Sequence, residues 1–331
     1  MSNRDIGFSL WLDFVERDFL RSEFPQMLEK GIINGATSNP SIFAQAISSS
    51  LAYKEQLAQM GDKSPKEKYE ALAITDIRIA AQELRECYDA GNDGYISIEV
   101  DPFLSNDTKG TVAEGKRLFA AIDEPNVMIK VPATEAGYDA MTELLSTGIS
   151  VNATLVFSPT QAKRCLKAMK KGLDAFEASG GGRCEGVISV FVSRFDRLLD
   201  PELAQHGIET GKTGIYNAAK IYNIIEKNHT PAVRTLFAST GVKGDDLPAD
   251  YYIRELLAPH SVNTAPLATI EAYIAKKEGT PKLPLDDDLI NGYFTKLADN
   301  GFDMDEIYDR LLKEGLQAFE KAFGEMLDTL K

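Results

Sequence analysis

Short apolar segments alternate with longer amphipathic segments along this chain, and this order limits the folds that it can adopt. Apolar runs of roughly four to eight residues read as buried strands, and apolar residues recurring every three to four positions read as helix. Strands that alternate with helices predict a largely parallel sheet. Eight strands favour an α/β fold, a (β/α)8 TIM barrel, although a doubly wound open sheet is not excluded by strand count. The predicted strands are residues 8–13, 33–38, 95–100, 127–131, 150–157, 187–192, 234–238 and 261–264.

The helical segments lie between these strands, and some carry clear end signals. Ser22 is a candidate N-cap for the helix that ends near residue 30, and Pro65 suits the first turn of a helix over 65–90. No linker or low-complexity segment divides the chain, so we expect residues 1–331 to form one barrel domain. Additional C-terminal helices over 289–331, with a turn at Asn300-Gly301, are expected to pack on it. The other helices are predicted over 41–58, 108–122, 134–146, 158–180, 215–228 and 251–256.

The charge of the chain makes several classes of partner unfavourable. Its 331 residues carry a formal net charge of −14, and the pI is near 4.8. An acidic surface repels nucleic acid and anionic membranes, so neither is expected as a partner. No apolar run approaches the roughly 20 residues of a membrane span, and the first residues lack the apolar core of a signal peptide. A phosphorylated substrate would need a local positive pocket.

Cysteine and histidine are few and scattered. The cysteines are odd in number and show no CxxC spacing, which favours a reducing, cytoplasmic location over a disulfide framework. No histidine is spaced for a metal with a cysteine or another histidine, so no metal site is expected. These residues are Cys87, Cys165, Cys184, His206, His229 and His260.

One predicted strand contains a lysine between apolar neighbours, in Val127-Met-Ile-Lys-Val-Pro-Ala-Thr134. Burial disfavours the charged form of an amine, and an uncharged lysine is a nucleophile whose usual partner is a carbonyl. The alternative is a lysine whose stem packs in the strand while its ammonium reaches water. Lys130 is therefore a candidate nucleophile, and its surroundings decide between the two interpretations.

Polar side chains stand at the predicted carboxyl ends of most strands. In a (β/α)8 barrel these ends meet at one face, where active sites of such folds lie. An amine grouped with two carboxylates predicts an active site, although Asp13 can also cap a helix and Asn39 can begin an Asn-Pro turn. The polar residues are Asp13, Asn39, Glu99, Lys130, Asn152, Thr154, Ser189 and Ser239.

A short segment, Thr210-Gly-Lys-Thr213, resembles the end of a phosphate-binding P-loop. Such a loop needs a glycine five residues before Gly211, where this chain has His206, and it must follow a strand. Neither condition holds here, so nucleotide binding is not expected.

Six motifs resemble those of the transaldolase family and keep their order. They are Trp11-Leu-Asp13, Gly35-Ala-Thr-Ser-Asn-Pro-Ser-Ile-Phe43, Ser97-Ile-Glu-Val-Asp101, Ile129-Lys-Val-Pro-Ala-Thr134, Gly148-Ile-Ser-Val-Asn-Ala-Thr-Leu155 and Ile188-Ser-Val-Phe-Val-Ser-Arg194. The resemblance runs from about residue 8 to about residue 275. It implies a class I aldolase barrel that moves a dihydroxyacetone unit from a ketose phosphate to an aldose phosphate. Sedoheptulose 7-phosphate and glyceraldehyde 3-phosphate would give erythrose 4-phosphate and fructose 6-phosphate, with no metal or organic cofactor.

The resemblance implies a role for each matching residue. Lys130 matches the lysine that forms a Schiff base with the ketose C2 carbonyl, and Asp13 the carboxylate that takes the C4-hydroxyl proton. Glu99 and Thr154 match a pair that holds a water for proton transfer during imine formation and hydrolysis. Contacts to substrate hydroxyls or to the pocket wall are implied for Asn39, Asn152, Ser189 and Phe191.

The implied phosphate site departs from the family pattern. Arg194 matches a phosphate-binding arginine, and a guanidinium binds phosphate through two parallel hydrogen bonds. Many family members have a Ser-Phe-Arg triplet after strand seven, but this chain has Ala238-Ser-Thr-Gly-Val-Lys243. Ser239 keeps its place, and the second cation is expected to be Lys243.

Two other functions remain open from the sequence. Fructose-6-phosphate aldolase shares the scaffold but usually has glutamine in place of Glu99 and tyrosine in place of Phe191, so transaldolase is favoured. A non-catalytic sugar-phosphate-binding barrel would use the lysine and the carboxylates as an ion network. Small sugar phosphates are the expected partners, and a homo-oligomer is possible because the C-terminal helices can cover a barrel face or a partner.

Overall fold

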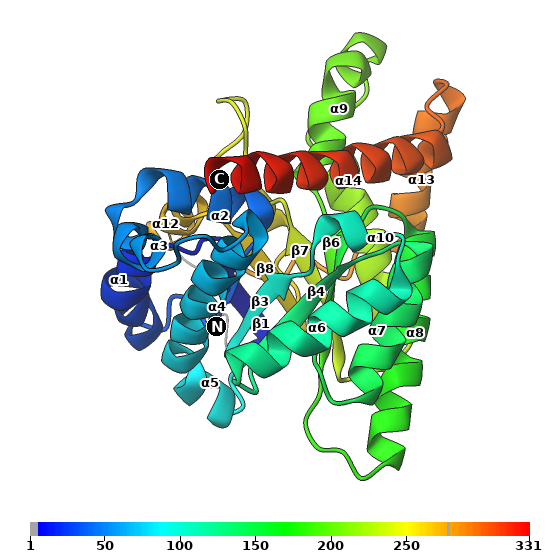
Figure 1. The fold of residues 1–331 in the computed structure, drawn as a ribbon. Coiled ribbons are helices and arrows are strands. Elements are labelled where there is room, and N and C mark those ends of the chain that lie inside the picture. Colours follow the sequence, from blue (N-terminus) through cyan, green and yellow to red (C-terminus); the bar gives the residue numbers. More distant parts are fainter. Residues whose placement is uncertain (1–5, 277–278) are drawn as a thin grey trace.

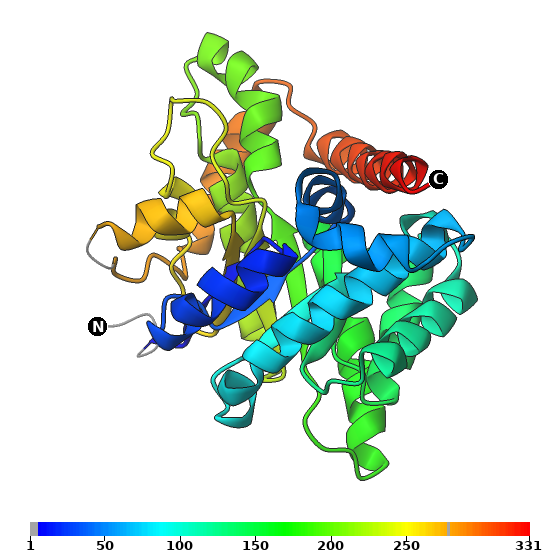
Figure 2. The same ribbon diagram turned by 60° about the vertical axis from the view of Figure 1, so that its left-hand side comes forward.

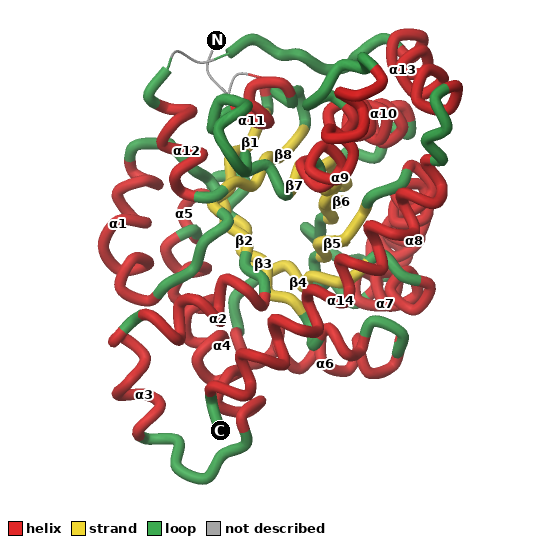
Figure 3. The backbone as a smooth tube through the Cα atoms, turned by 90° about the horizontal axis from the view of Figure 1, so that it is seen from above, coloured by secondary structure: helices red, strands yellow, loops and turns green. Residues whose placement is uncertain are grey.

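The centre of the protein is a closed barrel of eight parallel strands, in a computed structural model that describes residues 6–276 and 279–331. Each strand pairs with the next, and β8 closes the ring against β1, with Phe8 opposite Ser261. Figure 3 shows the ring end-on with helices outside it. The predicted (β/α)8 barrel is confirmed, and the open sheet is excluded. The strands are β1 (Phe8–Leu12), β2 (Gly35–Thr37), β3 (Tyr95–Glu99), β4 (Val127–Pro132), β5 (Val151–Val156), β6 (Gly186–Phe191), β7 (Val233–Ala238) and β8 (Ser261–Ala265).

The helices between the strands follow the predicted order with some corrections. The segments predicted over 41–58 and 65–90 are each interrupted, the first by a 3₁₀ helix η2 (Leu51–Tyr53) and the second at residue 84. α9 (Ser193–Leu203) and α12 (Leu267–Ile274) have no predicted counterpart, because α9 contains Pro201 and α12 is short. The others are α2 (Pro40–Ser49), α3 (Lys54–Ala58), α4 (Pro65–Glu83), α5 (Arg85–Asp89), α6 (Thr108–Ile122), α7 (Glu135–Ser146), α8 (Pro159–Ala178), α10 (Thr213–Lys227) and α11 (Tyr251–Glu255).

The first helix, α1 (Arg17–Glu29), begins at a different cap from the predicted one. Glu16 is the N-cap, and its carboxylate accepts a hydrogen bond from Phe19 N at 2.8 Å. Ser22 lies inside the helix, where its hydroxyl donates to Asp18 O at 2.7 Å. A serine can satisfy its hydroxyl in this way within a helix, so the prediction of Ser22 as a cap was wrong.

Two helices follow the barrel, and the second crosses its end. They are α13 (Asp287–Asp299) and α14 (Met304–Thr329), with Asn300 and Gly301 between them as predicted. In Figure 1, α14 is the red helix across the top, and Figure 2 places it at the same end. It packs against α2, the end of β5 and a 3₁₀ helix, η3 (Pro102–Leu104). The assignment of residues 1–331 to one domain, with 289–331 packed on it, stays a prediction.

None of the helices in the described ranges 6–276 and 279–331 combines the length and apolar character that crossing a membrane requires. The barrel strands are instead covered by amphipathic helices. α8, for example, buries Ala162, Cys165 and Met169 on one face. This spacing of three and four residues matches the helical period.

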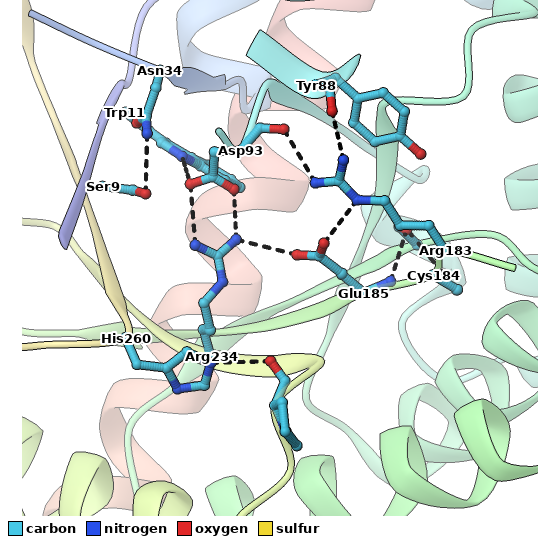
Figure 4. Close-up of polar contacts among 12 residues, drawn as sticks. Ser9, Trp11, Asn34, Tyr88, Asp93, Arg183, Cys184, Glu185, Arg234 and His260 are labelled. Carbon is cyan, nitrogen blue, oxygen red and sulfur yellow. Dashed lines mark hydrogen bonds and ion pairs between the residues drawn. The ribbon is translucent and has the colours of Figure 1, made fainter. Parts of the chain in front are cut away.

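A buried ion pair closes the end of the barrel opposite α14 (Figure 4). Arg234 of β7 donates to both carboxylate oxygens of Asp93, at 2.6 and 3.1 Å, and the Trp11 indole donates to Asp93 Oδ2 at 2.9 Å. Burial opposes the charge of Asp93, but Arg234 and Trp11 hold its pKa below the ordinary value. Trp11 also fills the space beside Gly35, where a Cβ would lie 2.4 Å from Nε1.

Replacing Arg234 by leucine would leave the buried Asp93 carboxylate without its cation. We expect the free energy of unfolding at pH 7 to fall by about 3–5 kcal/mol, measured by urea unfolding. Because folding lowers the pKa of Asp93, the pair stabilises above the unfolded value near 3.8 and loses its effect in acid. The difference from wild type should therefore shrink as the pH falls.

The exposed pair of Arg310 and Glu314 on α14 provides the control. Arg310→Leu should change the unfolding free energy by less than about 1 kcal/mol, because solvent screens such pairs. Equal effects of Arg234→Leu and Arg310→Leu would contradict the structural role given to Arg234.

Candidate active site

A cavity of about 210 Å³ lies at the carboxyl ends of the strands. Its lining comes from strands on several sides of the barrel, from the segments that follow them, and from α14. This is the face where the sequence predicts an active site. The lining residues are Asp13, Thr37, Asn39, Ser41, Lys130, Ser189, Phe191, Arg194, Ala238, Ser239, Thr264 and Phe319.

The predicted nucleophile is almost completely buried beside a carboxylate. Lys130 is 6% exposed, and its Nζ donates to Ser38 O at 3.1 Å and lies 3.7 Å from Glu99 Oε2. This position rules out a lysine whose ammonium reaches bulk water. Burial raises the pKa of Glu99 to about 7, while Lys130 acts in the opposite direction. The pKa of Glu99 therefore lies in the range that suits proton transfer near neutral pH.

The second predicted carboxylate, Asp13, also lies near enough to Lys130 to interact with it electrostatically. Asp13 follows β1, and its Oδ1 accepts a hydrogen bond from Thr37 Oγ1 at 2.7 Å. Thr37 Oγ1 lies 2.6 Å from Thr264 Oγ1, so three strands meet in one hydroxyl–carboxylate chain. Burial raises the pKa of Asp13, and Lys130 and Thr37 limit that rise. Asp13 is placed to accept a proton from a group in the cavity.

The polar residues of β5 are buried and do not line the cavity themselves, but Asn152 contacts a residue that does. Asn152 Nδ2 donates to Ser97 Oγ at 3.0 Å, and Ser189 Oγ donates to Asn152 Oδ1 at 2.6 Å, so Asn152 positions Ser189 at the cavity lining. Thr154 is fully buried, and within the described chain its Oγ1 has no hydrogen-bond partner. The Glu99 carboxylate oxygens likewise have no hydrogen-bond donor among the described residues. Such unpaired buried groups are the kind that an ordered water satisfies.

Asn39 combines the two roles considered for it. Its Oδ1 accepts a hydrogen bond from Ile42 N at 3.1 Å and so caps α2. It also lines the cavity, where the amide nitrogen is the group available to a ligand. The capping role therefore does not exclude a binding role.

Arg194 brings a positive charge to the cavity lining, where Glu314 acts on it only through longer-range attraction. Arg194 opens α9 with its guanidinium carbon 5.1 Å from the centre of the Phe191 ring. No hydrogen bond or ion pair to the described residues involves Arg194, and burial, with Arg197 nearby, lowers its pKa. Ser239 Oγ lies 3.0 Å from Ser193 Oγ beside it. An unpaired, half-buried guanidinium is suited to bind an anion such as phosphate.

Comparison with known proteins identifies the family. A model described as Transaldolase/Fructose-6-phosphate aldolase matches residues 10–330. A Transaldolase from Campylobacter jejuni strain RM1221 is 46% identical over 331 aligned residues, which cover 98% of this chain and 99% of that protein. A Transaldolase from Helicobacter pylori strain 26695 is 43% identical over 323 residues, covering 97% and 99%. The chain belongs to the transaldolase/fructose-6-phosphate aldolase family.

The family match extends further than the motifs in the sequence. The motif resemblance ends near residue 275, whereas the transaldolase/fructose-6-phosphate aldolase model continues to residue 330. It therefore includes α13 and α14, and α14 contributes Phe319 to the cavity. The C-terminal helices therefore belong to the family fold, and α14 also contributes to the candidate site.

Five lining residues were absent from the sequence prediction. Thr37 and Thr264 are polar residues within short strands, so the signal that pointed to Ser189 was present for them too. Phe319 carries no such signal, because it lies on an amphipathic helix far from any strand end. The set is Thr37, Ser41, Ala238, Thr264 and Phe319.

Lys243 lies apart from this cavity. It is exposed in the segment between β7 and α11 and is not among the lining residues. A role in binding the second phosphate therefore stays a prediction.

The segment that resembles a P-loop end is filled by the protein's own carboxylates. Asp200 accepts from Gly211 N at 3.0 and 3.1 Å, and Asp196 Oδ1 accepts from Gly214 N at 2.9 Å. These are backbone N–H groups that a phosphate would need at the start of α10. The geometry agrees with the exclusion of nucleotide binding there.

Proposed function

We propose that this chain is a transaldolase, a transferase of the non-oxidative pentose phosphate pathway. It would move a dihydroxyacetone unit from sedoheptulose 7-phosphate or fructose 6-phosphate to glyceraldehyde 3-phosphate or erythrose 4-phosphate. The observation that carries the proposal is the buried Lys130 amine 3.7 Å from Glu99, in a cavity lined also by Asp13. The relatives named Transaldolase support it.

The first step joins the ketose to the enzyme. The Lys130 amine attacks the C2 carbonyl, and the resulting carbinolamine loses water to give an iminium ion. Glu99 and Thr154 would hold the water that carries protons to and from the C2 oxygen. A carboxyl with a pKa of about 7 can both give and take a proton at neutral pH.

The second step breaks the carbon–carbon bond. Asp13 takes the proton of the C4 hydroxyl as the C3–C4 bond breaks, and the bond electrons move into the iminium to form an enamine. The aldose phosphate leaves, and the enamine carbon attacks the aldehyde of the acceptor, which recovers the proton from Asp13. Hydrolysis of the new imine frees Lys130.

The other residues that the sequence predicts for the site are assigned to substrate binding. Asn39, Asn152 and Ser189 would orient the dihydroxyacetone hydroxyls, and Phe191 would form an apolar wall. Arg194 and Ser239 would bind the phosphate, with Lys243 as the second cation. We propose no metal or organic cofactor.

Dependence on an acceptor tests this function. Purified protein given fructose 6-phosphate and erythrose 4-phosphate should form sedoheptulose 7-phosphate and glyceraldehyde 3-phosphate, measured by mass spectrometry. Fructose 6-phosphate alone should release little free dihydroxyacetone. Release at the full transfer rate without an acceptor would instead support fructose-6-phosphate aldolase, which the family description also names.

Lys243→Ala tests the second phosphate cation. We expect KM to rise about tenfold for both phosphorylated substrates, with a smaller change in kcat, because a phosphate contact remote from the reacting atoms acts mainly on binding. Steady-state kinetics measure the effect. Lys170→Ala, which removes an exposed lysine on α8, should leave both constants unchanged. An unaltered KM in Lys243→Ala would remove Lys243 from the site.

Partners and location follow from this proposal. Small sugar phosphates are the proposed ligands, and neither nucleic acid nor membrane is a proposed partner. We propose a cytoplasmic location, where the phosphorylated substrates occur.

A further inference from the structure

β5 contains an extra residue beside Thr154. Ala153 pairs with Ile188 and Val156 pairs with Val190, so β5 advances three residues (153 to 156) where β6 advances two (188 to 190). The irregularity includes Leu155, a fully buried leucine with φ of +57°. This left-handed conformation is unfavourable for a residue other than glycine, so surrounding contacts must hold it. Bulges next to active sites often redirect a side chain.

The bulge gives two consecutive side chains to the interior of the barrel. Strand alternation places Thr154 on the face of Asn152, which bonds with residues inside the barrel. Leu155 also packs in the inner cluster, and its Cδ2 lies 3.0 Å from where a Cβ on Gly315 of α14 would be. Val156 then belongs to the outer core beneath the helices. One strand therefore places the Thr154 hydroxyl inside the barrel and supports α14 with Leu155.

A single side chain holds this bulge through its carbonyl. Gln161, 8% exposed in the first turn of α8, donates from Nε2 to Leu155 O at 3.1 Å and to Ala133 O at 3.0 Å. Its Oε1 accepts from Phe157 N at 2.9 Å and Ser158 N at 3.1 Å. All four hydrogen-bonding positions of the amide are thus used.

These bonds connect the strands of two proposed catalytic residues. Ala133 directly follows β4, which carries Lys130, and Ala133 N donates to Thr154 O at 2.8 Å. The Gln161 amide joins the carbonyl groups of Ala133 and Leu155, and so fixes the peptide groups on either side of this link. A shift of Leu155 would move Thr154 relative to Lys130.

Helix capping alone does not account for this residue. In α4 the equivalent capping box uses Glu67, whose carboxylate accepts from Ser64 N at 2.9 Å and from the Ser64 hydroxyl. A carboxylate is therefore sufficient to cap a helix in this protein. Gln161 does the same with its oxygen, and its nitrogen is used only for the two strand-end carbonyls.

We propose that Gln161 is a positioning residue, whose amide clamps the β5 bulge to the end of β4 and thereby aims the Thr154 hydroxyl at Glu99 and Lys130. The proposal rests on the proposed function, because Thr154 has a role only if an imine forms. Misplacement of a reacting group by about 1 Å can cost roughly 100-fold in rate. The effect should fall on imine formation and hydrolysis, since no substrate contact is assigned to Gln161.

Gln161→Glu tests the clamp, because it keeps the capping oxygen and removes both donors. We expect kcat to fall by about 10- to 100-fold, with KM for fructose 6-phosphate changed by less than about threefold. The initial rate of imine formation, followed by borohydride quenching at short times, should fall by a similar factor. Gln161→Asn, an uncharged amide too short to span both carbonyls, should show the same pattern and serves if the carboxylate variant does not fold.

Ser158→Ala is the matched control, because it removes the other half of the same capping box. It should lower the thermal midpoint of unfolding, because the helix loses its N-cap hydroxyl, and leave kcat per folded molecule unchanged. If both Gln161 variants only lose stability and turn over as wild type per folded molecule, Gln161 is a helix cap and the proposal is wrong. If the wild type itself gives no borohydride adduct, the proposed transaldolase function is wrong, and the role of Gln161 that rests on it is wrong as well.

Discussion

Replacing Lys130 by arginine is expected to abolish turnover, with a loss in kcat on the order of 10⁴-fold or more. Arginine keeps a positive charge beside Glu99 and Asp13, but its guanidinium stays protonated and forms no imine. Lys130 is the only lysine among the described residues that line the cavity. No other side chain there can replace it as the nucleophile.

Borohydride reduction in the presence of fructose 6-phosphate measures the imine directly. The intact mass of the wild type should rise by one reduced sugar phosphate, and peptide mapping should place the adduct on Lys130. Lys130→Arg should trap nothing. A non-catalytic sugar-phosphate-binding barrel would trap nothing in either protein.

Lys66→Arg is the matched control for this substitution. Lys66 also pairs with two carboxylates, Asp101 at 2.6 Å and Glu114 at 2.8 Å, but it does not line the cavity. The variant should trap the adduct and turn over as wild type. An adduct on another lysine of the wild type would refute the assignment of Lys130.

The parts of this site that depend on strand order could be predicted from the sequence. Lys130, Glu99 and Asp13 stand in or directly after apolar segments, and a parallel barrel brings such ends together whatever their separation in the chain. Periodicity therefore predicts their grouping at one end of the barrel. Hydrogen bonds such as that from Thr37 to Asp13 follow from side-chain positions that periodicity does not encode.

Other features depend on packing between distant segments. The left-handed φ of Leu155 has no sequence signal, because glycine or asparagine is the usual residue there. Phe319 reaches the cavity only because α14 returns across the strand ends, and an amphipathic pattern does not say which surface a helix will meet. Glu16 caps α1 although serine, threonine, aspartate and asparagine are the preferred caps.

Replacing Glu99 by glutamine is expected to lower kcat by about 10²- to 10⁴-fold, because the variant loses proton transfer at C2. The folded pKa of Glu99 is raised to about 7 by burial, so the activity of the wild type should change with an inflection near pH 7. Glu99→Gln should lose this inflection. A kinetic pH profile from pH 5 to 9 measures both effects.

Glu99→Gln should lower activity but make the fold more stable than wild type at high pH. Folding raises the pKa of Glu99 from 4.5 to about 7, so its contribution to stability is complete below about 4.5 and is lost as the pH rises through 7. At about 1.4 kcal/mol per pKa unit, roughly 3 kcal/mol of wild-type stability should disappear between pH 5 and 8. Glu99→Gln should lack this loss in urea unfolding.

A gain in stability above pH 7 together with a loss of activity is expected of a residue kept for chemistry rather than for packing. Asp93 provides the contrast, since its pKa is lowered by Arg234 and its ion pair stabilises the fold at neutral pH. Both carboxylates are almost completely buried, at 5% and 7% exposure, so burial alone does not separate them. If Glu99→Gln were as active as wild type and showed the same pH dependence of stability, Glu99 would be a structural partner of Lys130 and the proposed proton transfer would be wrong.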